Sequence, residues 1–148
     1  MSDKVEFSLD ARGIRAAFDK LNGQTQGALE RGAQGGGLVI QAGMKRRIMQ
    51  GGKSGHVYKR GGKEHVASAP GEPPATDTGA LANSIQTIVT ARRPDYAETQ
   101  TGSPLDYSES LEFGTSKMEA RPYGRPTLDE DRDAIEAAII GAIRKAAT

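Results

Sequence analysis

The sequence contains no cysteine and no tryptophan. Without cysteine the chain has no disulfide bond, no thiol catalysis and no thiolate metal site. Aromatic residues make up only 5% of its 148 residues, so aliphatic and small side chains must supply most of the buried surface. No window approaches the roughly 18 consecutive apolar residues of a membrane helix. The N-terminal MSDKVEFSLD has no apolar run of signal-peptide length. We therefore expect a soluble protein that is assembled in the cytoplasm.

The net charge is also small, at +1, which argues against a general affinity for polyanions. The charges are nevertheless segregated along the chain. Residues 45–64 carry seven basic side chains and one acidic one, a net of +6, whereas residues 95–133 carry ten acidic and four basic ones, a net of −6. The chain therefore contains two segments of equal and opposite charge.

The chain has the length of one domain, and we treat residues 1–148 as a single unit. Apolar and polar residues alternate over residues 4–9, which predicts a strand. Asp10 follows as a candidate N-cap of a helix that includes Phe18 and Leu21. Asn22 and Gly23 predict a break in that helix.

A second helix is predicted over residues 26–50. Its expected inner face consists of Leu29, Ala33, Gly36 or Gly37, Ile40, Met44 and Ile48. The three consecutive glycines, residues 35–37, favour either a bend or the close approach of another backbone, and the sequence leaves both open.

Residues 51–78 show no periodicity and contain GGKSG, RGGK and SAPGEPPATDTG, which are typical of turns and extended chain. A connection of 28 residues is far longer than usual, and such segments are commonly functional or disordered. We interpret this segment as a basic arm, rich in glycine and proline, that is mobile in the free subunit.

Beyond the arm, Thr78 is predicted to cap a short helix, followed by an antiparallel pair of strands over residues 85–90 and 96–101. A helix is predicted from Ser103 to about Phe113, with Gly114 as its stop. Thr127 and Glu130 match a capping box for the last helix. The expected inner face of that helix is Leu128, Ile135, Ile139, Ala142 and Ile143.

These elements predict an α+β fold with a long N-terminal helical region, a small antiparallel sheet, a C-terminal helix and a long basic flexible loop.

No residue pattern indicates an enzyme, a cofactor site or a metal site. His56 and His65 lie in the glycine-rich loop and are interpreted as solvated side chains. The four acids within residues 129–133 favour the helix dipole at a helix start. GGKSG fails the P-loop pattern because Arg47 stands where the leading glycine is required. The basic stretch around Tyr58 could contact DNA phosphates or an acidic protein surface.

Four motifs carry a resemblance to a known family. SAPGEPPATDTGALANSI (residues 68–85) resembles the segment before the central strand in the gp-ten-like family of phage tail-completion and head–tail joining proteins. YSESLEFGT (residues 107–115) looks like the helix end of that family, and ARPYGRPTL (residues 120–128) is similar to its Arg-Pro repeat. SGHVYKRGG resembles its basic arm. The resemblance extends from about residue 26 to the C-terminus, with departures at Ser108 and Gly124.

The resemblance implies a structural virion protein without catalysis or cofactor. It implies a six-fold ring of identical subunits, assembled in the bacterial cytoplasm and placed in the neck of a phage or phage-like particle. The expected partners are other copies of the chain, neighbouring neck proteins and the tail tube protein, with DNA passing through the lumen without sequence recognition. No membrane is involved. The alternative is a small DNA-binding packaging accessory protein that uses the basic arm.

The opposite charges of the two segments suggest that subunits associate head-to-tail, the basic residues of one copy meeting the acidic residues of the next. The competing explanation is that both segments lie on one subunit's own surface. The residues predicted to form the interface are Lys45, Arg46, Arg47, Lys59, Arg60, Glu109, Leu111, Glu112, Phe113, Arg121, Tyr123, Arg125, Asp129 and Asp131.

Overall fold

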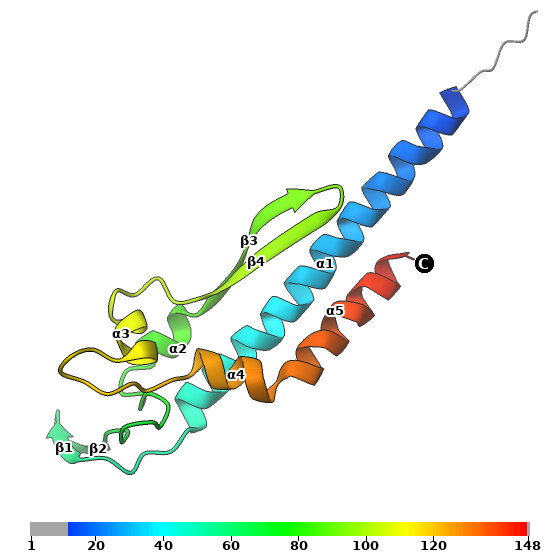
Figure 1. Ribbon diagram of the computed structural model, residues 1–148. Coiled ribbons are helices and arrows are strands. Elements are labelled where there is room, and N and C mark those ends of the chain that lie inside the picture. Colours follow the sequence, from blue (N-terminus) through cyan, green and yellow to red (C-terminus); the bar gives the residue numbers. More distant parts are fainter. Residues whose placement is uncertain (1–11, 148) are drawn as a thin grey trace, which may run out of the picture.

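The computed structural model describes residues 12–147 (Figure 1). The predicted strand over residues 4–9 and the cap at Asp10 lie outside the described residues. The elements, in chain order, are α1 (Arg12–Gln50), β1 (Val57–Arg60), β2 (Lys63–Val66), α2 (Ala80–Ser84), β3 (Gln86–Arg93), β4 (Tyr96–Gly102), α3 (Tyr107–Phe113), α4 (Gly124–Glu130) and α5 (Arg132–Ala147). The α+β prediction is confirmed, with two small antiparallel sheets in place of one.

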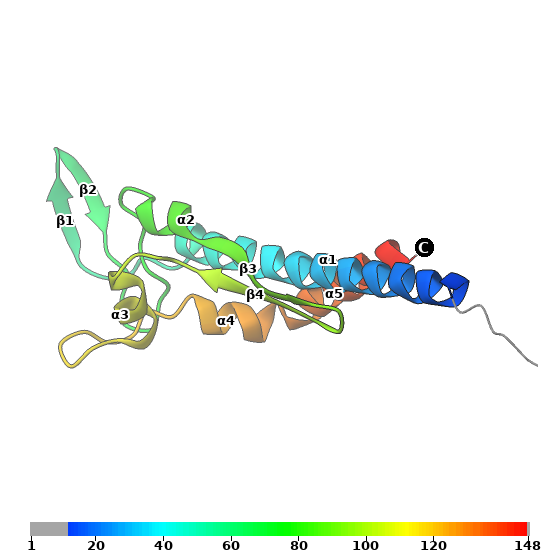
Figure 2. The ribbon, with the colours of Figure 1, turned by 90° about the horizontal axis from the view of Figure 1, so that it is seen from above.

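Helix α1 is the axis on which the other elements are arranged (Figures 1 and 2). Its 39 residues give it a length of about 58 Å. The predicted break at Asn22 and Gly23 is wrong, because the helix continues through both. A helical glycine costs only about 1 kcal/mol relative to alanine, which one position in a long helix tolerates. The hydroxyl of Thr25 donates to the carbonyl of Leu21 within the same turn.

The glycines of α1 let α5 pack closely beside it. A Cβ atom on Gly36 would lie 2.7 Å from Cγ1 of Ile139, and one on Gly32 would lie 2.7 Å from Cγ1 of Ile143. Both distances are shorter than any ordinary carbon–carbon contact. Of the two alternatives left open for the glycine triplet, the structure therefore shows close packing.

The hairpin of β3 and β4 lies along another side of α1 and is attached to it by threonine hydroxyls. Thr87 and Thr101 both donate to the carbonyl of Gly37, at 2.9 and 3.2 Å, and Thr99 donates to the carbonyl of Ala33 at 3.0 Å. Because Gly37 has no side chain, the methyl group of Thr87 can approach the helix. The paired strands confirm the predicted antiparallel hairpin.

The hydrophobic core lies at the C-terminal end of α1, where α2, α3 and α4 gather. Its buried members are Met44, Ile48, Leu81, Ala82, Ile85 and Tyr123. Ile40, Leu105 and Leu111 pack against it while partly exposed. The predicted inner face of α1 supplies Ile40, Met44 and Ile48 to this core.

Residues 51–78 contain regular structure, and the prediction that they lack it is wrong. β1 and β2 form a hairpin around Gly61 and Gly62, whose φ angles are +58° and +78°. Two successive positive φ values match the twist of a two-residue hairpin turn. Glu72 holds the rest of the segment, accepting hydrogen bonds from the amides of Ser54 and Ala69 at 3.0 and 2.7 Å. The mobility of this arm in the free subunit stays a prediction.

The C-terminal region is two helices, and the predicted capping box is wrong. Helix α4 begins at Gly124, so Thr127 lies inside it and its hydroxyl donates to the carbonyl of Tyr123 at 2.7 Å. Leu128 is 47% exposed and does not belong to an inner face. Helix α3 begins at Tyr107, later than the predicted Ser103, and ends before Gly114 as predicted. Gly114 has a φ of +76°, which a residue with a side chain rarely adopts.

Candidate subunit interface

The fourteen residues predicted to form an interface gather at one end of the molecule. They lie on the last turns of α1, on β1, on α3, on α4 and in the segments next to them, around the C-terminal end of α1 (Figure 1). The N-terminal end of α1 lies at the opposite extreme, beyond the end of α5 (Figures 1 and 2). The structure therefore brings the predicted site together in space, although its members are up to 86 residues apart in the chain.

Part of the basic segment meets the acidic segment within one chain. Arg46 Nη2 lies 2.7 Å from Asp131 Oδ2, and Arg47 Nη2 lies 2.6 Å from Glu130 Oε2. Arg47 Nε also donates to the hydroxyl of Thr127 at 3.0 Å. The hydrogen bond and charge of Arg47 hold the pKa of Glu130 below its usual value. These ion pairs form on one subunit's own surface. They therefore give no reason to place Arg46, Arg47 and Asp131 between neighbouring subunits.

Glu112 has a structural role that the sequence did not indicate. Its carboxylate accepts hydrogen bonds from the backbone amides of Tyr123, Gly124 and Arg125, all at 2.8 Å. These amides open α4 and have no partner within that helix. The carboxylate of α3 therefore caps α4 and fixes the two helices to each other. Because Glu112 is 12 residues from Gly124, no local capping pattern could have found it.

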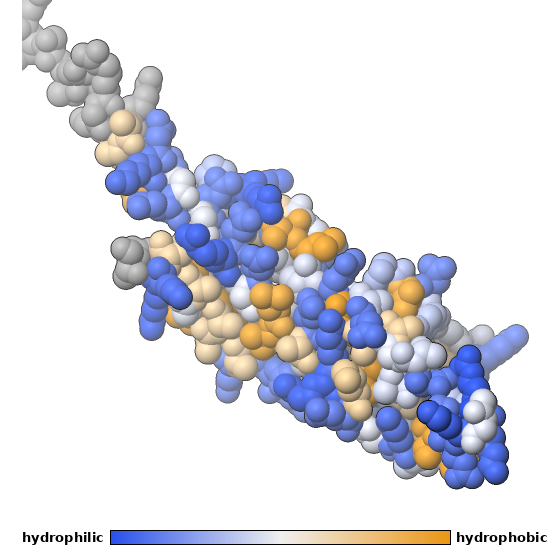
Figure 3. All heavy atoms as spheres, turned by 180° about the vertical axis from the view of Figure 1, so that it is seen from behind, coloured by the Kyte–Doolittle hydropathy of each residue, from blue (hydrophilic) through white to orange (hydrophobic). Residues whose placement is uncertain are grey.

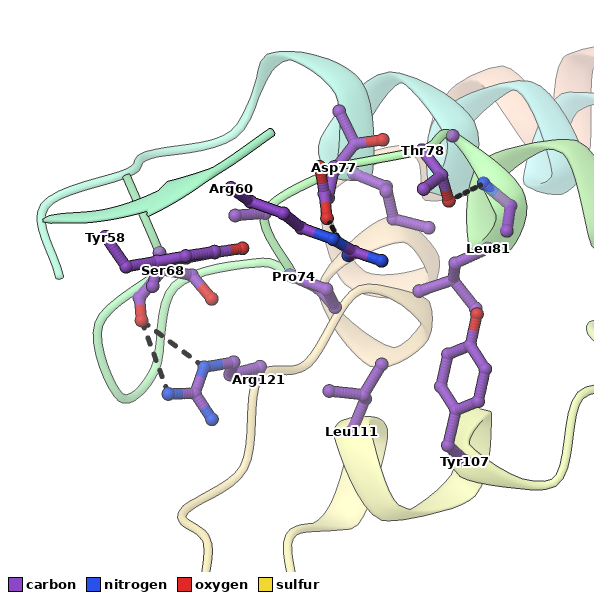
Figure 4. A pocket seen from close by; sticks show the side chains of 16 residues that line it. Tyr58, Arg60, Ser68, Pro74, Asp77, Thr78, Leu81, Tyr107, Leu111 and Arg121 are labelled. Carbon is purple, nitrogen blue, oxygen red and sulfur yellow. Dashed lines mark hydrogen bonds and ion pairs between the residues drawn. The ribbon is translucent and has the colours of Figure 1, made fainter. Parts of the chain in front are cut away.

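A cavity of about 340 Å³ opens between the β1–β2 hairpin, α2 and α3 (Figure 4). Arg60 of β1 forms an ion pair with Asp77, and His65 Nδ1 lies 3.3 Å from the same carboxylate. The ring of His65 stacks on Tyr58. The interpretation of His65 as a solvated loop side chain is therefore wrong, because it is partly buried between Tyr58 and Asp77.

Arg121 enters the same cavity from the segment before α4. Its Nη2 and Nε atoms lie 3.3 and 3.4 Å from the carbonyl oxygen of Ser68, and Leu111 and Tyr107 of α3 complete the wall (Figure 4). Sequence reasoning found Arg121 and Leu111 but missed Tyr107 and Ser68. The motif SAPGEPPATDTG signalled Ser68 as part of a distinctive segment, without indicating that the segment folds over α3.

A second, more apolar hollow of about 520 Å³ lies between α3, α4 and the end of β4. Phe113 and Leu128 are exposed at 63% and 47%, and the guanidinium of Arg125 lies 5.9 Å from the ring centre of Phe113. Tyr123, by contrast, is buried in the core, and burial raises its pKa. Of the predicted apolar contacts, Phe113 is free to touch a partner, Leu111 only in part, and Tyr123 is not.

Within residues 12–147 no group of three or more His, Cys, Asp or Glu side chains could hold a metal ion. No helix in the same part of the chain is long and apolar enough to cross a membrane. That the chain has no catalytic activity and no cofactor stays a prediction.

The chain was compared with family models, curated proteins and solved structures, and none of them matches it.

Proposed function

We propose that the chain is a structural subunit of a virion, which forms a ring at the head–tail junction and joins the capsid connector to the tail tube. In this role it binds other copies of itself, neighbouring neck proteins and the tail tube protein. DNA passes through the lumen of the ring without sequence recognition. The motifs over residues 54–62, 68–85, 107–115 and 120–128 are the sequence basis of the proposal.

The observation that carries the proposal is the imbalance between buried and exposed apolar side chains. Among the described residues, only seven hydrophobic ones are buried, and two of those are alanines. Thirteen large hydrophobic side chains are exposed: Phe18, Leu21, Leu38, Met49, Val57, Tyr58, Val66, Ile88, Tyr96, Tyr107, Phe113, Leu128 and Ile140. They occur on α1, on both hairpins and on α3, α4 and α5. We infer that part of this exposed apolar surface is buried against partners in the assembled particle.

The alternative, a DNA-binding packaging accessory protein, is less well supported by the charges of the basic arm. It depends on the basic arm, but Arg60 pairs with Asp77, and Lys59 Nζ lies 3.7 Å from Glu64. Arg46 and Arg47 at the end of α1 also pair with acids. Most of the positive charge that would release counterions from DNA is therefore already partnered.

The test is native mass spectrometry of the purified full-length chain, with negative-stain imaging of the same sample. We expect a discrete closed oligomer that appears as a ring, and a labelled subunit located at the neck of the assembled particle. A chain that stays monomeric at every concentration, and binds DNA with an affinity that falls steeply with salt, would contradict the proposal and favour the alternative.

A further inference from the structure

Helix α1 has two parts that differ in their surroundings. Every residue from 16 to 25 is exposed, and we call these ten residues the overhang. Within it Phe18 is 60% exposed and Leu21 is 56% exposed. From Ala28 onward the same helix is covered, and Ala28 itself is buried. The overhang therefore presents large apolar side chains to solvent just where the covering elements end.

The exposed side chains continue the surface that α5 covers. Phe18, Leu21, Ala28, Gly32 and Gly36 follow one another at steps of three, four or seven residues, which places them on one face of the helix. Gly32 and Gly36 of this face lie against Ile143 and Ile139 of α5. Helix α5 ends at Ala147, and α1 extends past that end (Figures 1 and 2). Among the described residues, none covers this extension of an interface that already accepts α5.

The side of α5 that faces away from α1 is exposed and carries a small apolar patch between charged side chains. Ile140 is 48% exposed, Ala137 and Gly141 are exposed beside it, and Asp133 and Arg144 are exposed on the same side of the helix. A Cβ atom on Gly141 would meet no heavy atom within 4 Å. Figure 3 shows apolar residues gathered over α5 next to the C-terminus. We call this surface the outer face of α5.

We propose that the overhang of one copy packs on the outer face of α5 in the next copy. The two surfaces cannot meet within one chain, because the overhang lies past the end of α5 and the outer face points away from α1. Their side chains are complementary in size, since Phe18 and Leu21 are large and Ala137 and Gly141 leave room beside Ile140. The contact reverses the arrangement inside the chain, where the isoleucines of α5 lie on the glycines of α1.

A contact between two different surfaces of identical chains repeats from copy to copy until it closes into a ring. Helices α1 and α5 would then join neighbouring subunits of the ring. This contact rests on the proposed function, which supplies the closed ring. It also replaces the charge pairing of Arg46, Arg47 and Asp131 as the source of head-to-tail association, because those groups are already paired within the chain.

The test uses the absence of native cysteine. Full-length chains carrying Leu21→Cys are mixed with chains carrying Gly141→Cys and exposed to a mild oxidant. A disulfide requires Cα atoms about 4.4–6.8 Å apart, so it reports a direct contact. The matched control replaces Leu21→Cys by Ala16→Cys, which is also exposed but lies roughly 200° around the helix from Phe18. Native mass spectrometry of the unmodified chain, before oxidation, records the oligomeric state.

We expect the Leu21→Cys and Gly141→Cys pair to form a cross-linked dimer at least about tenfold faster than the control pair, because a contact raises the effective concentration of the thiols. If rings form while the two pairs cross-link at the same rate, the inference is wrong and the proposed ring stands. If the unmodified chain is monomeric and neither pair cross-links, the inference and the proposed function both fail.

Discussion

The overhang and the remainder of α1 belong to one continuous helix, yet they differ in what surrounds them. After Ala28 the helix contacts α5, the β3–β4 hairpin, α2 and α4. Every residue from 16 to 25, by contrast, is exposed. Isolated helices gain little stability in water, and most helical stability in proteins comes from tertiary packing. The covered part is therefore stabilised by contacts within this chain, and the proposed contact with a neighbouring copy would supply the packing that the overhang lacks among the described residues.

The largest expected effect comes from the covered part. Ile48 is 1% exposed in the core, so Ile48→Ala should lower the free energy of unfolding by about 2–5 kcal/mol, through lost burial and the cavity left behind. The matched control is Leu21→Ala in the overhang, which should change the stability of the isolated subunit by less than about 0.5 kcal/mol. Urea unfolding of dilute subunits measures both. Similar losses in the two variants would show that the overhang is packed in the free chain.

The cap on α4 should have the next largest effect. Glu112→Ala removes the acceptor of the three backbone amides at the start of α4. We expect the free energy of unfolding to fall by about 1–3 kcal/mol. Glu109→Ala on the same helix is the control, because Glu109 is exposed and should contribute little. Equal stability of the two variants in urea unfolding would contradict the capping role of Glu112.

Two glycines of α1 test the difference within the helix itself. Gly23→Ala in the overhang should stabilise the subunit by up to about 1 kcal/mol, because a Cβ there has open space and alanine favours helix. The same change at Gly36 gains the same propensity but forces Ile139 aside, which typically costs about 1–3 kcal/mol. Thermal unfolding should therefore rank Gly23→Ala above the unmodified chain and Gly36→Ala well below Gly23→Ala. Equal shifts would mean that α5 does not pack on Gly36.

The smallest expected effect is the pH dependence of the Arg47–Glu130 pair. The folded pKa of Glu130 is lowered by Arg47, so this pair stabilises the fold above the unfolded pKa of about 4.3. That contribution is lost as the pH falls through the lower folded pKa. Between neutral and acidic pH, the urea midpoint of unfolding should fall less in Glu130→Gln than in Glu136→Gln. Glu136 is an exposed control on α5, and its variant keeps the Arg47–Glu130 pair. The same acid loss in both variants would contradict the assignment.

Some patterns confined to one segment predicted parts of the fold correctly. The β3–β4 hairpin, the inner residues Ile40, Met44 and Ile48 of α1 and the stop at Gly114 all follow from neighbouring residues. The β1–β2 hairpin was missed because both of its strands are almost entirely exposed and show no alternation. Its one signal was the Gly61-Gly62 pair between two short runs of strand-compatible residues.

The candidate site depended on contacts that no local pattern encodes. Glu112 and Thr127 each satisfy backbone groups in or next to α4. The spacing of Thr127 and Glu130 matches a capping box, but the start of α4 is capped by Glu112 of α3, which is distant in the sequence. Arg46 and Asp131 are 85 residues apart. A sequence shows that such charges are complementary, but only the fold decides whether they meet within a chain or between chains.

Hydrogen exchange of the backbone amides in α1 tests the central claim most directly, because protection reports local opening in the free and assembled states. In dilute subunits we expect amides of residues 16–25 to exchange rapidly and those from Ala28 to Ile48 to be protected. In the assembled oligomer residues 16–25 should become protected, while the covered part changes little. Equal protection of residues 16–25 in the two states would contradict the claim that a neighbouring copy completes this helix.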